Sequence, residues 1–125
     1  MLKYIFCLLL LSNISLASSS IDCRDPKNIN ECAKITFTKS EAVYNNFIQN
    51  IVLKLNTKTS NEYADQFIKI ENEWRKLVKT QCEHLREFYQ GGSIGSTSFI
   101  SCYDIMYEKR VSELQTIYDD IIGKR

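Results

Sequence analysis

Cys82, Glu83 and His84 are the first side chains in this sequence that suggest chemistry, because a thiol beside an imidazole can act as a nucleophile with its base. Close neighbours on a helix point in different directions, however, so Cys82 and His84 would not face each other. His84 is the single histidine, and we interpret it as a surface residue near a helix end. Serine-hydrolase, zinc-protease and phosphate-loop motifs do not occur. The sequence therefore predicts no catalytic residue, no cofactor and no enzymatic activity.

Carboxylate pairs and aromatic residues are the other candidates for a site. Charged residues on helices usually form the solvated face, so we expect Glu71 with Glu73, and Asp119 with Asp120, to be exposed. Trp74 and the seven tyrosines are numerous enough for a binding face, but most of them occupy positions of an apolar helical stripe. We therefore expect these aromatic residues to form the core.

Four of the five cysteines are expected to form two disulfides. Cys7 lies in an apolar N-terminal segment that we expect to be cleaved, which leaves Cys23, Cys32, Cys82 and Cys102. An even number of cysteines in a short exported chain is typical of a disulfide framework. Zinc sites usually take two ligands from a motif such as C-x-x-C, whereas the gaps here are wide. The sequence therefore favours disulfides over a metal site.

The N-terminal segment has the three parts of a secretory signal. Lys3 is a short positive region, Tyr4 to Leu11 is an uninterrupted apolar run, and Ser15-Leu16-Ala17 supplies the small residues that a signal peptidase reads. The apolar run is about half the ~20 residues that span a bilayer, and bulky residues precede Cys7 where a lipidation site needs small ones. We predict a signal peptide over residues 1–17 and one periplasmic or secreted domain over residues 18–125, without a membrane anchor.

The charge balance narrows the class of partner. The formal net charge is +1, and it falls to zero when Lys3 is removed with the signal peptide. Nucleic-acid binding is favoured by a strongly basic face, so a neutral chain argues against it. We therefore expect no nucleic-acid partner.

Apolar residues recur at three- and four-residue spacing, which predicts helices rather than strands. The first helix is expected from about Glu31 to Asn56. The second is expected to start with a capping box of Thr59 and Glu62 and to end near Tyr89. The third is expected from about Phe99 to Ile122, stopped by Gly123. The faces predicted to point inward are Tyr44, Phe47, Ile48, Ile51, Val52 and Leu55 on the first helix, Tyr63, Phe67, Ile70, Trp74, Leu77, Val78, Leu85 and Phe88 on the second, and Tyr103, Met106, Tyr107, Val111, Leu114, Ile117, Tyr118 and Ile121 on the third.

Three long helices with short connections predict an all-α, up-down-up bundle stapled by two disulfides. In that topology the cysteines gather at one end. Cys82, before the end of the second helix, would face Cys102, early in the third, across a helical hairpin. We favour Cys82–Cys102 with Cys23–Cys32, and the crossed set, Cys32–Cys82 with Cys23–Cys102, remains open.

The segment from Gln90 to Ser98 is predicted to be an exposed turn, because it holds three of the four glycines. It is either a plain linker or a binding loop, held at both ends by the cysteines that flank it. As a loop it would lose little entropy on binding, and Ile94 would be its apolar tip. The candidate partner-binding residues are Gly91, Gly92, Ser93, Ile94, Gly95 and Ser96.

Several of these features together resemble a known family. Trp74 to Cys82 has the form W-x7-C, Gly91-Gly92-Ser93 follows, and Cys102, Arg110 and Leu114 continue as C-x7-R-x3-L. With Asp22-Cys23, Asn30-Glu31-Cys32-Ala33 and Asn45, the pattern is similar to that of the LprI lysozyme inhibitors over about residues 22–114. The family often has an arginine four residues after the tryptophan, where this chain has Val78 followed by Lys79.

The resemblance implies a secreted or periplasmic helical domain of a type that includes a lysozyme inhibitor. We expect a protein that blocks a lysozyme active-site cleft with the glycine-rich segment, where Ser93 or Ser96 would donate hydrogen bonds to the catalytic carboxylates. The alternative is an envelope protein-interaction module without inhibitory activity.

Overall fold

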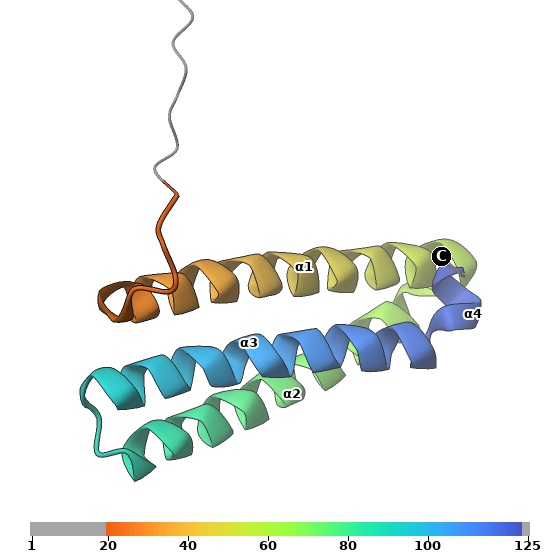
Figure 1. The fold of residues 1–125 in the computed structure, drawn as a ribbon. Coiled ribbons are helices and arrows are strands. Elements are labelled where there is room, and N and C mark those ends of the chain that lie inside the picture. Colours follow the sequence, from red (N-terminus) through yellow and green to blue (C-terminus); the bar gives the residue numbers. More distant parts are fainter. Residues whose placement is uncertain (1–19, 124–125) are drawn as a thin grey trace, which may run out of the picture.

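Three long helices form an up-down-up bundle, as predicted. The computed structural model describes residues 20–123, so the expected signal peptide and Cys7 lie outside the described residues. A short 3-10 turn, η1 (Pro26–Asn28), leads into α1 (Ile29–Lys58), α2 (Asn61–Phe88), α3 (Gly92–Ile117) and the one-turn α4 (Asp119–Ile122) (Figure 1). Residues 20–123 contain no strand, and none of their helices is both long and apolar enough to cross a membrane.

The connection between α1 and α2 is tighter than the predicted polar break. Thr59 ends α1, since its backbone N–H and its hydroxyl both donate to the carbonyl of Leu55. The expected capping box of Thr59 with Glu62 is therefore wrong, because the hydroxyl is bonded to the preceding helix. Ser60 is the N-cap residue of α2 instead, without a side-chain capping bond.

The connection between α2 and α3 is also shorter than predicted. The N–H of Gly91 donates to the carbonyl of Arg86, and that of Gln90 donates to Glu87, which is the bonding pattern of a Schellman motif. Gln90, Gly91 and Gly92 all have positive φ, and α3 begins at Gly92. The prediction of a nonhelical turn over residues 90–98 is wrong beyond its first residues. The glycines turn the chain, and the serines and threonine after them already belong to α3.

The core is an apolar stripe on each helix, and the stripe on α1 is the predicted one with Val52 at its edge. On α2 the prediction is partly wrong, because Tyr63, Ile70, Leu77 and Phe88 are exposed. The buried face of α2 consists of Ala64, Phe67, Glu71, Val78 and Cys82. The periodicity was misassigned because a small residue and a carboxylate occupy core positions.

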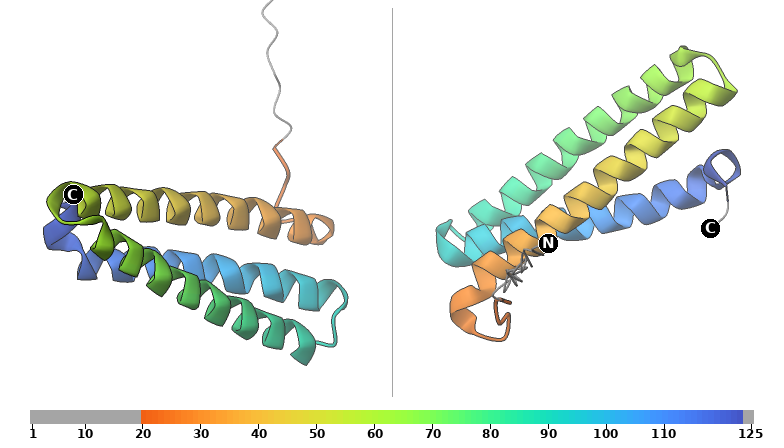
Figure 2. Two further views of the ribbon diagram at one scale, coloured as in Figure 1. Left: turned by 180° about the vertical axis from the view of Figure 1, so that it is seen from behind. Right: turned by 90° about the horizontal axis from the view of Figure 1, so that it is seen from above.

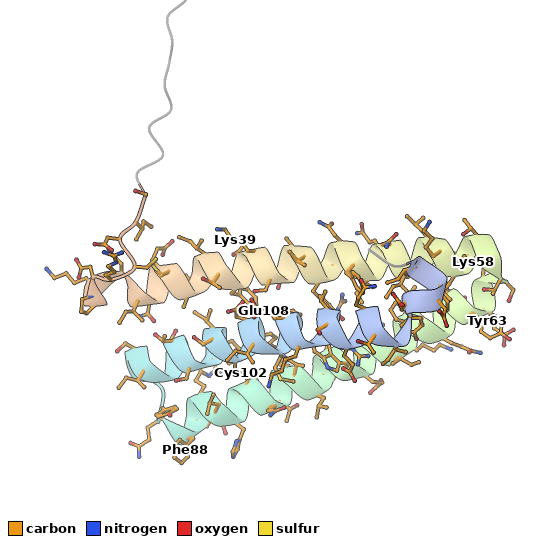
Figure 3. All side chains as sticks on the ribbon, turned by 45° about the vertical axis from the view of Figure 1, so that its right-hand side comes forward. Lys39, Lys58, Tyr63, Phe88, Cys102 and Glu108 are labelled. Carbon is orange, nitrogen blue, oxygen red and sulfur yellow. A yellow bond between two sulfur atoms is a disulfide. The ribbon has the colours of Figure 1, made fainter. Side chains whose placement is uncertain are left out.

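The C-terminal part of the bundle bends back onto α1. The predicted third helix is interrupted at Tyr118, after which α4 turns towards the end of α1. There the ammonium group of Lys58 donates to the carbonyl of Ile121 at 2.8 Å, and Figure 3 shows this lysine beside the final turn. α4 thereby closes the end of the bundle where α1 and α2 are joined.

The three helices are not evenly spaced along the bundle. α1 and α2 meet at their connection and diverge toward the other end, where α3 lies between them (Figures 1 and 2). That other end holds the start of α1, the end of α2 and the start of α3. We call it the stapled end, because both disulfides lie there.

Candidate functional site: the stapled end of the bundle

The two disulfides have the favoured pairing. Cys23–Cys32 spans 5.8 Å between Cα atoms, and Cys82–Cys102 spans 5.6 Å. Cys82 is completely buried between α2 and α3, whereas Cys23 is exposed on the segment before η1. One disulfide therefore fixes the α2–α3 hairpin, and the other holds the N-terminal segment on the first turn of α1.

The predicted partner-binding residues lie together at the start of α3, but they differ in exposure. Ser93, Ile94 and Ser96 are exposed on the first turns of the helix. Gly95 is buried, and a Cβ atom there would lie 3.0 Å from the carbonyl oxygen of Arg86. Gly95 therefore lets α3 approach α2 closely, and Gly92 has a φ of +68° that favours glycine.

Apolar side chains surround this start of α3. Ile94 is 66% exposed, Ile29 is 47% exposed, and Phe88 is 71% exposed at the end of α2 (Figure 3). A shallow pocket of about 250 Å³ separates η1 and α1 from α3. It is lined by Pro26, Ile29, Asn30, Ser93, Ile94, Thr97 and Ser98. A hydrogen bond from the Thr97 hydroxyl to the Asn30 side-chain oxygen joins its two walls.

The N-terminus of α3 has neither a capping side chain nor an acidic residue to balance its partial positive charge. Its N-cap residue is Gly91, no side chain caps it, and its first turn holds no acidic residue. The first amide N–H groups of a helix lack intrahelical acceptors and carry a partial positive charge. This end of α3 therefore favours an approaching carboxylate.

Trp74 of the W-x7-C pattern and Arg110 of the C-x7-R pattern meet away from the stapled end, whereas the cysteines of both patterns form the disulfide there. The Arg110 guanidinium lies 5.4 Å from the ring centroid of Trp74 and forms a salt bridge with Glu71. Glu71 also accepts a 2.8 Å hydrogen bond from the Tyr44 hydroxyl. The expectation that Glu71 is exposed is wrong, because it is 1% exposed and paired within the core. The sequence could have indicated this burial, because Glu71 is spaced at helical intervals from Phe67 and Val78 on the same face of α2.

The pKa values of these buried groups follow from the pairing. Burial would lower the pKa of the Arg110 guanidinium, but its hydrogen bonds to Glu71 and Glu113 raise it. Burial raises the pKa of the Tyr44 hydroxyl, and its bond to Glu71 raises it further. The cluster therefore holds a charged pair and a neutral phenol near neutral pH, which suits a structural role.

Clusters suited to metal binding do not occur in the part of the chain that the structure describes. Residues 20–123 contain no cluster of three histidine, cysteine, aspartate or glutamate side chains that would hold a metal ion. His84 is exposed on α2, and its neighbour Cys82 is in a disulfide.

Comparison with known proteins gives one informative result. No curated protein and no solved structure matches the chain. The family described as lysozyme inhibitor LprI matches residues 23–114, which begin at the first disulfide cysteine and end at Leu114 in the core. Both disulfides and the Trp74–Arg110 contact fall inside the match. The two disulfides and this family fit an extracytoplasmic protein, and the chain belongs to the LprI family of lysozyme inhibitors.

Proposed function

We propose that this protein is an exported lysozyme inhibitor and that it binds its target with the stapled end. The supporting observation is the exposed apolar side chain of Ile94 on a rigid helix start, in a chain that belongs to an inhibitor family. An apolar side chain that projects from a fixed backbone loses little conformational entropy on binding. The Cys82–Cys102 disulfide contributes to that rigidity, because it joins α3 covalently to α2 close to the helix start that carries Ile94.

The mode of binding differs from the insertion of a flexible loop. Ser93 and Ser96 lie on the first turns of α3, so their hydroxyls move with the helix. A lysozyme cleft contains two catalytic carboxylates. The uncapped N-terminus of α3 suits one of them, because helix N-termini bind anions through free N–H groups and the helix dipole. We infer that the helix start approaches the cleft, with Ile94 in apolar contact beside it.

Long-range attraction contributes little to this interaction. The formal net charge of the chain is close to zero, so a basic enzyme would not be strongly steered toward it. Affinity then depends on contacts at short range, among which one buried apolar anchor usually has a large share. This makes the proposal sensitive to a single substitution at the tip.

The test is inhibition of lysozyme hydrolysis of cell-wall substrate by the purified, oxidised mature protein. We expect the wild-type protein to inhibit, and Ile94→Glu to weaken inhibition at least about tenfold, because a charge would have to be buried at the contact. Ile117→Glu is the matched control, since Ile117 is 61% exposed at the opposite end of the same helix. It should inhibit like the wild type.

Two results would contradict the proposal. Unchanged lysozyme activity at large molar excess of protein would exclude inhibition of that enzyme, and the test should include several lysozyme types. Equal inhibition by Ile94→Glu and Ile117→Glu would exclude the stapled end as the contact. Specific crosslinking to a different envelope protein, without inhibition, would favour an interaction module instead.

A further inference from the structure

A second surface lies between α1 and α3, the two helices that supply all of its lining residues. It is a hollow of about 340 Å³, which we call the aromatic trough. Its lining residues are Phe37, Glu41, Phe99, Ile100, Tyr103 and Tyr107. Four of these six are aromatic, and they come from two helices.

The rings of the trough are arranged around Tyr103. Its ring centroid lies 5.8 Å from that of Phe37, 5.1 Å from that of Phe99 and 5.9 Å from that of Tyr107. Phe37 and Phe99 both meet it edge to face. Such a cluster offers several ring faces within a small volume, which is the arrangement that binds organic cations.

Two carboxylates act on Tyr103 from different helices, Glu41 as part of the trough lining and Glu83 from α2. Burial raises the pKa of Tyr103, and the charges of Glu83 on α2 and Glu41 on α1 raise it further. Burial and Glu41 likewise raise the pKa of Tyr107 to about 12. Glu41 and Glu83 are both half-buried, and neither forms a salt bridge within residues 20–123. Arg75 acts on the Tyr107 pKa in the opposite direction, whereas the charges that act on Tyr103 are both negative.

The chain already places one of its own guanidinium groups on a ring of the trough and another on a neighbouring ring. Arg75 lies 5.2 Å from the ring centroid of Tyr44 and donates a hydrogen bond to Asn45. Arg86 lies 4.8 Å from the ring centroid of Phe99. Each of these cations is held at one side of the aromatic cluster. Neither of them is placed over the ring of Tyr103, on which the charges of Glu41 and Glu83 both act.

From this geometry we propose that the aromatic trough is a binding site for a cationic side chain, an arginine or lysine presented by a basic protein. The rings supply cation–π contact, and Glu41 and Glu83 supply the opposite charge. The trough is separate from the residues of the stapled end pocket, so it is a second contact region. That the basic protein is a lysozyme rests on the proposed function above, whereas the cation site does not.

The direct test uses two peptides that differ only in charge. Acetyl-Gly-Arg-Gly-amide is titrated into the oxidised protein with labelled tyrosine rings, and acetyl-Gly-citrulline-Gly-amide is the neutral analogue of the same shape. We expect the arginine peptide to shift the ring signals of Tyr103 and Tyr107 in a saturable manner in NMR spectra. The citrulline peptide should leave them unchanged at the same concentrations. Equal shifts with both peptides would overturn the proposal.

Variants that lack the two carboxylates then test whether their charges contribute to binding of the arginine peptide. Glu41→Gln with Glu83→Gln should weaken binding of the arginine peptide at least about tenfold, because two opposite charges are lost while the rings remain. Glu108→Gln is the matched control, since it removes one carboxylate from α3 that lines a different groove (Figure 3). It should bind like the wild type. Unchanged affinity in the double variant would overturn the proposal.

The two proposals fail separately. If the arginine peptide binds but no lysozyme is inhibited, the trough remains a cation site and the proposed function is wrong. If lysozyme is inhibited equally by the wild type and by the double variant, the inhibitor proposal stands and the trough plays no part in it.

Discussion

Glu71 occupies a core position that an apolar side chain would usually fill. Removing its charge from water is costly, and the cost is offset only because Arg110 and Tyr44 satisfy the carboxylate on both sides. The three residues come from three different helices, α1, α2 and α3. The pairing therefore fixes how these helices are aligned, in addition to any net stability that it contributes.

Replacement of Glu71 should consequently lower the stability of the protein. In Glu71→Gln the Arg110 guanidinium, whose side chain is only 10% exposed, would remain buried without its main counter-charge. We expect the free energy of unfolding to fall by about 2–4 kcal/mol, measured by urea denaturation at neutral pH. Glu73→Gln is the control, since Glu73 pairs with Lys76 at an exposed site and should cost less than about 1 kcal/mol. Equal effects of the two substitutions would contradict a structural role for the buried pair.

At the scale of the elements, the sequence predicted the number and direction of the long helices correctly, and the favoured disulfide pairing is the observed one. Those features follow from long-range periodicity and from connection lengths, which are visible in one chain. The start of α3 was missed because glycines weaken a helix on average, whereas Gly91 and Gly92 stand at its very beginning. The buried side of α2 was predicted only in part, because Glu71 is of a residue type that usually lies on the surface, and only its partners in the fold explain its position.

The residues that we propose to contact a partner were harder to identify from the sequence than the helices were. Exposure of Ile94 depends on where α3 starts, and the burial of Gly95 depends on its contact with the backbone of Arg86. The aromatic trough combines residues that are distant in sequence, and of its rings Tyr103 and Tyr107 were expected to be core. Tyr107 is indeed buried, while Tyr103 and Phe37 are partly exposed at the rim. Which rings face the trough depends on how α1 and α3 pack against each other.

The turn between α2 and α3 offers a test of the element that positions the site. Gln90 is the only described residue other than glycine with a positive φ, at 56°. It occupies the left-handed position of the Schellman motif, where glycine is strongly preferred. We expect Gln90→Gly to increase the free energy of unfolding by about 0.5–1 kcal/mol, because the strain of a side chain is relieved. Gln81→Gly, within α2, should instead destabilise the protein by a similar amount. A loss of stability in Gln90→Gly would contradict the assigned backbone conformation, and thermal unfolding measures both.

For the whole molecule, both disulfides act on the same end but on different parts of it. Cys23–Cys32 closes a sequence separation of 9, and Cys82–Cys102 closes one of 20. Loop length alone would make their entropic contributions differ by less than about 1 kcal/mol. Burial separates them further, because Cys82 is fully buried while Cys23 is exposed. The hairpin disulfide should therefore dominate the stability of the bundle.

Removal of each disulfide in turn tests this division. We expect Cys82→Ala with Cys102→Ala to lower the free energy of unfolding by about 3–5 kcal/mol, since loop closure and buried packing are both lost. Cys23→Ala with Cys32→Ala should cost less, about 1–3 kcal/mol, and should leave the α2–α3 hairpin intact. Urea denaturation gives the stabilities, and amide hydrogen exchange locates the loosened segments. Faster exchange at the end of α2 and the start of α3 is expected only in the first variant, because the second disulfide is confined to the segment before α1 and its first turn. If the second variant were the less stable one, the N-terminal segment, and not the hairpin, would be the part that holds the stapled end together.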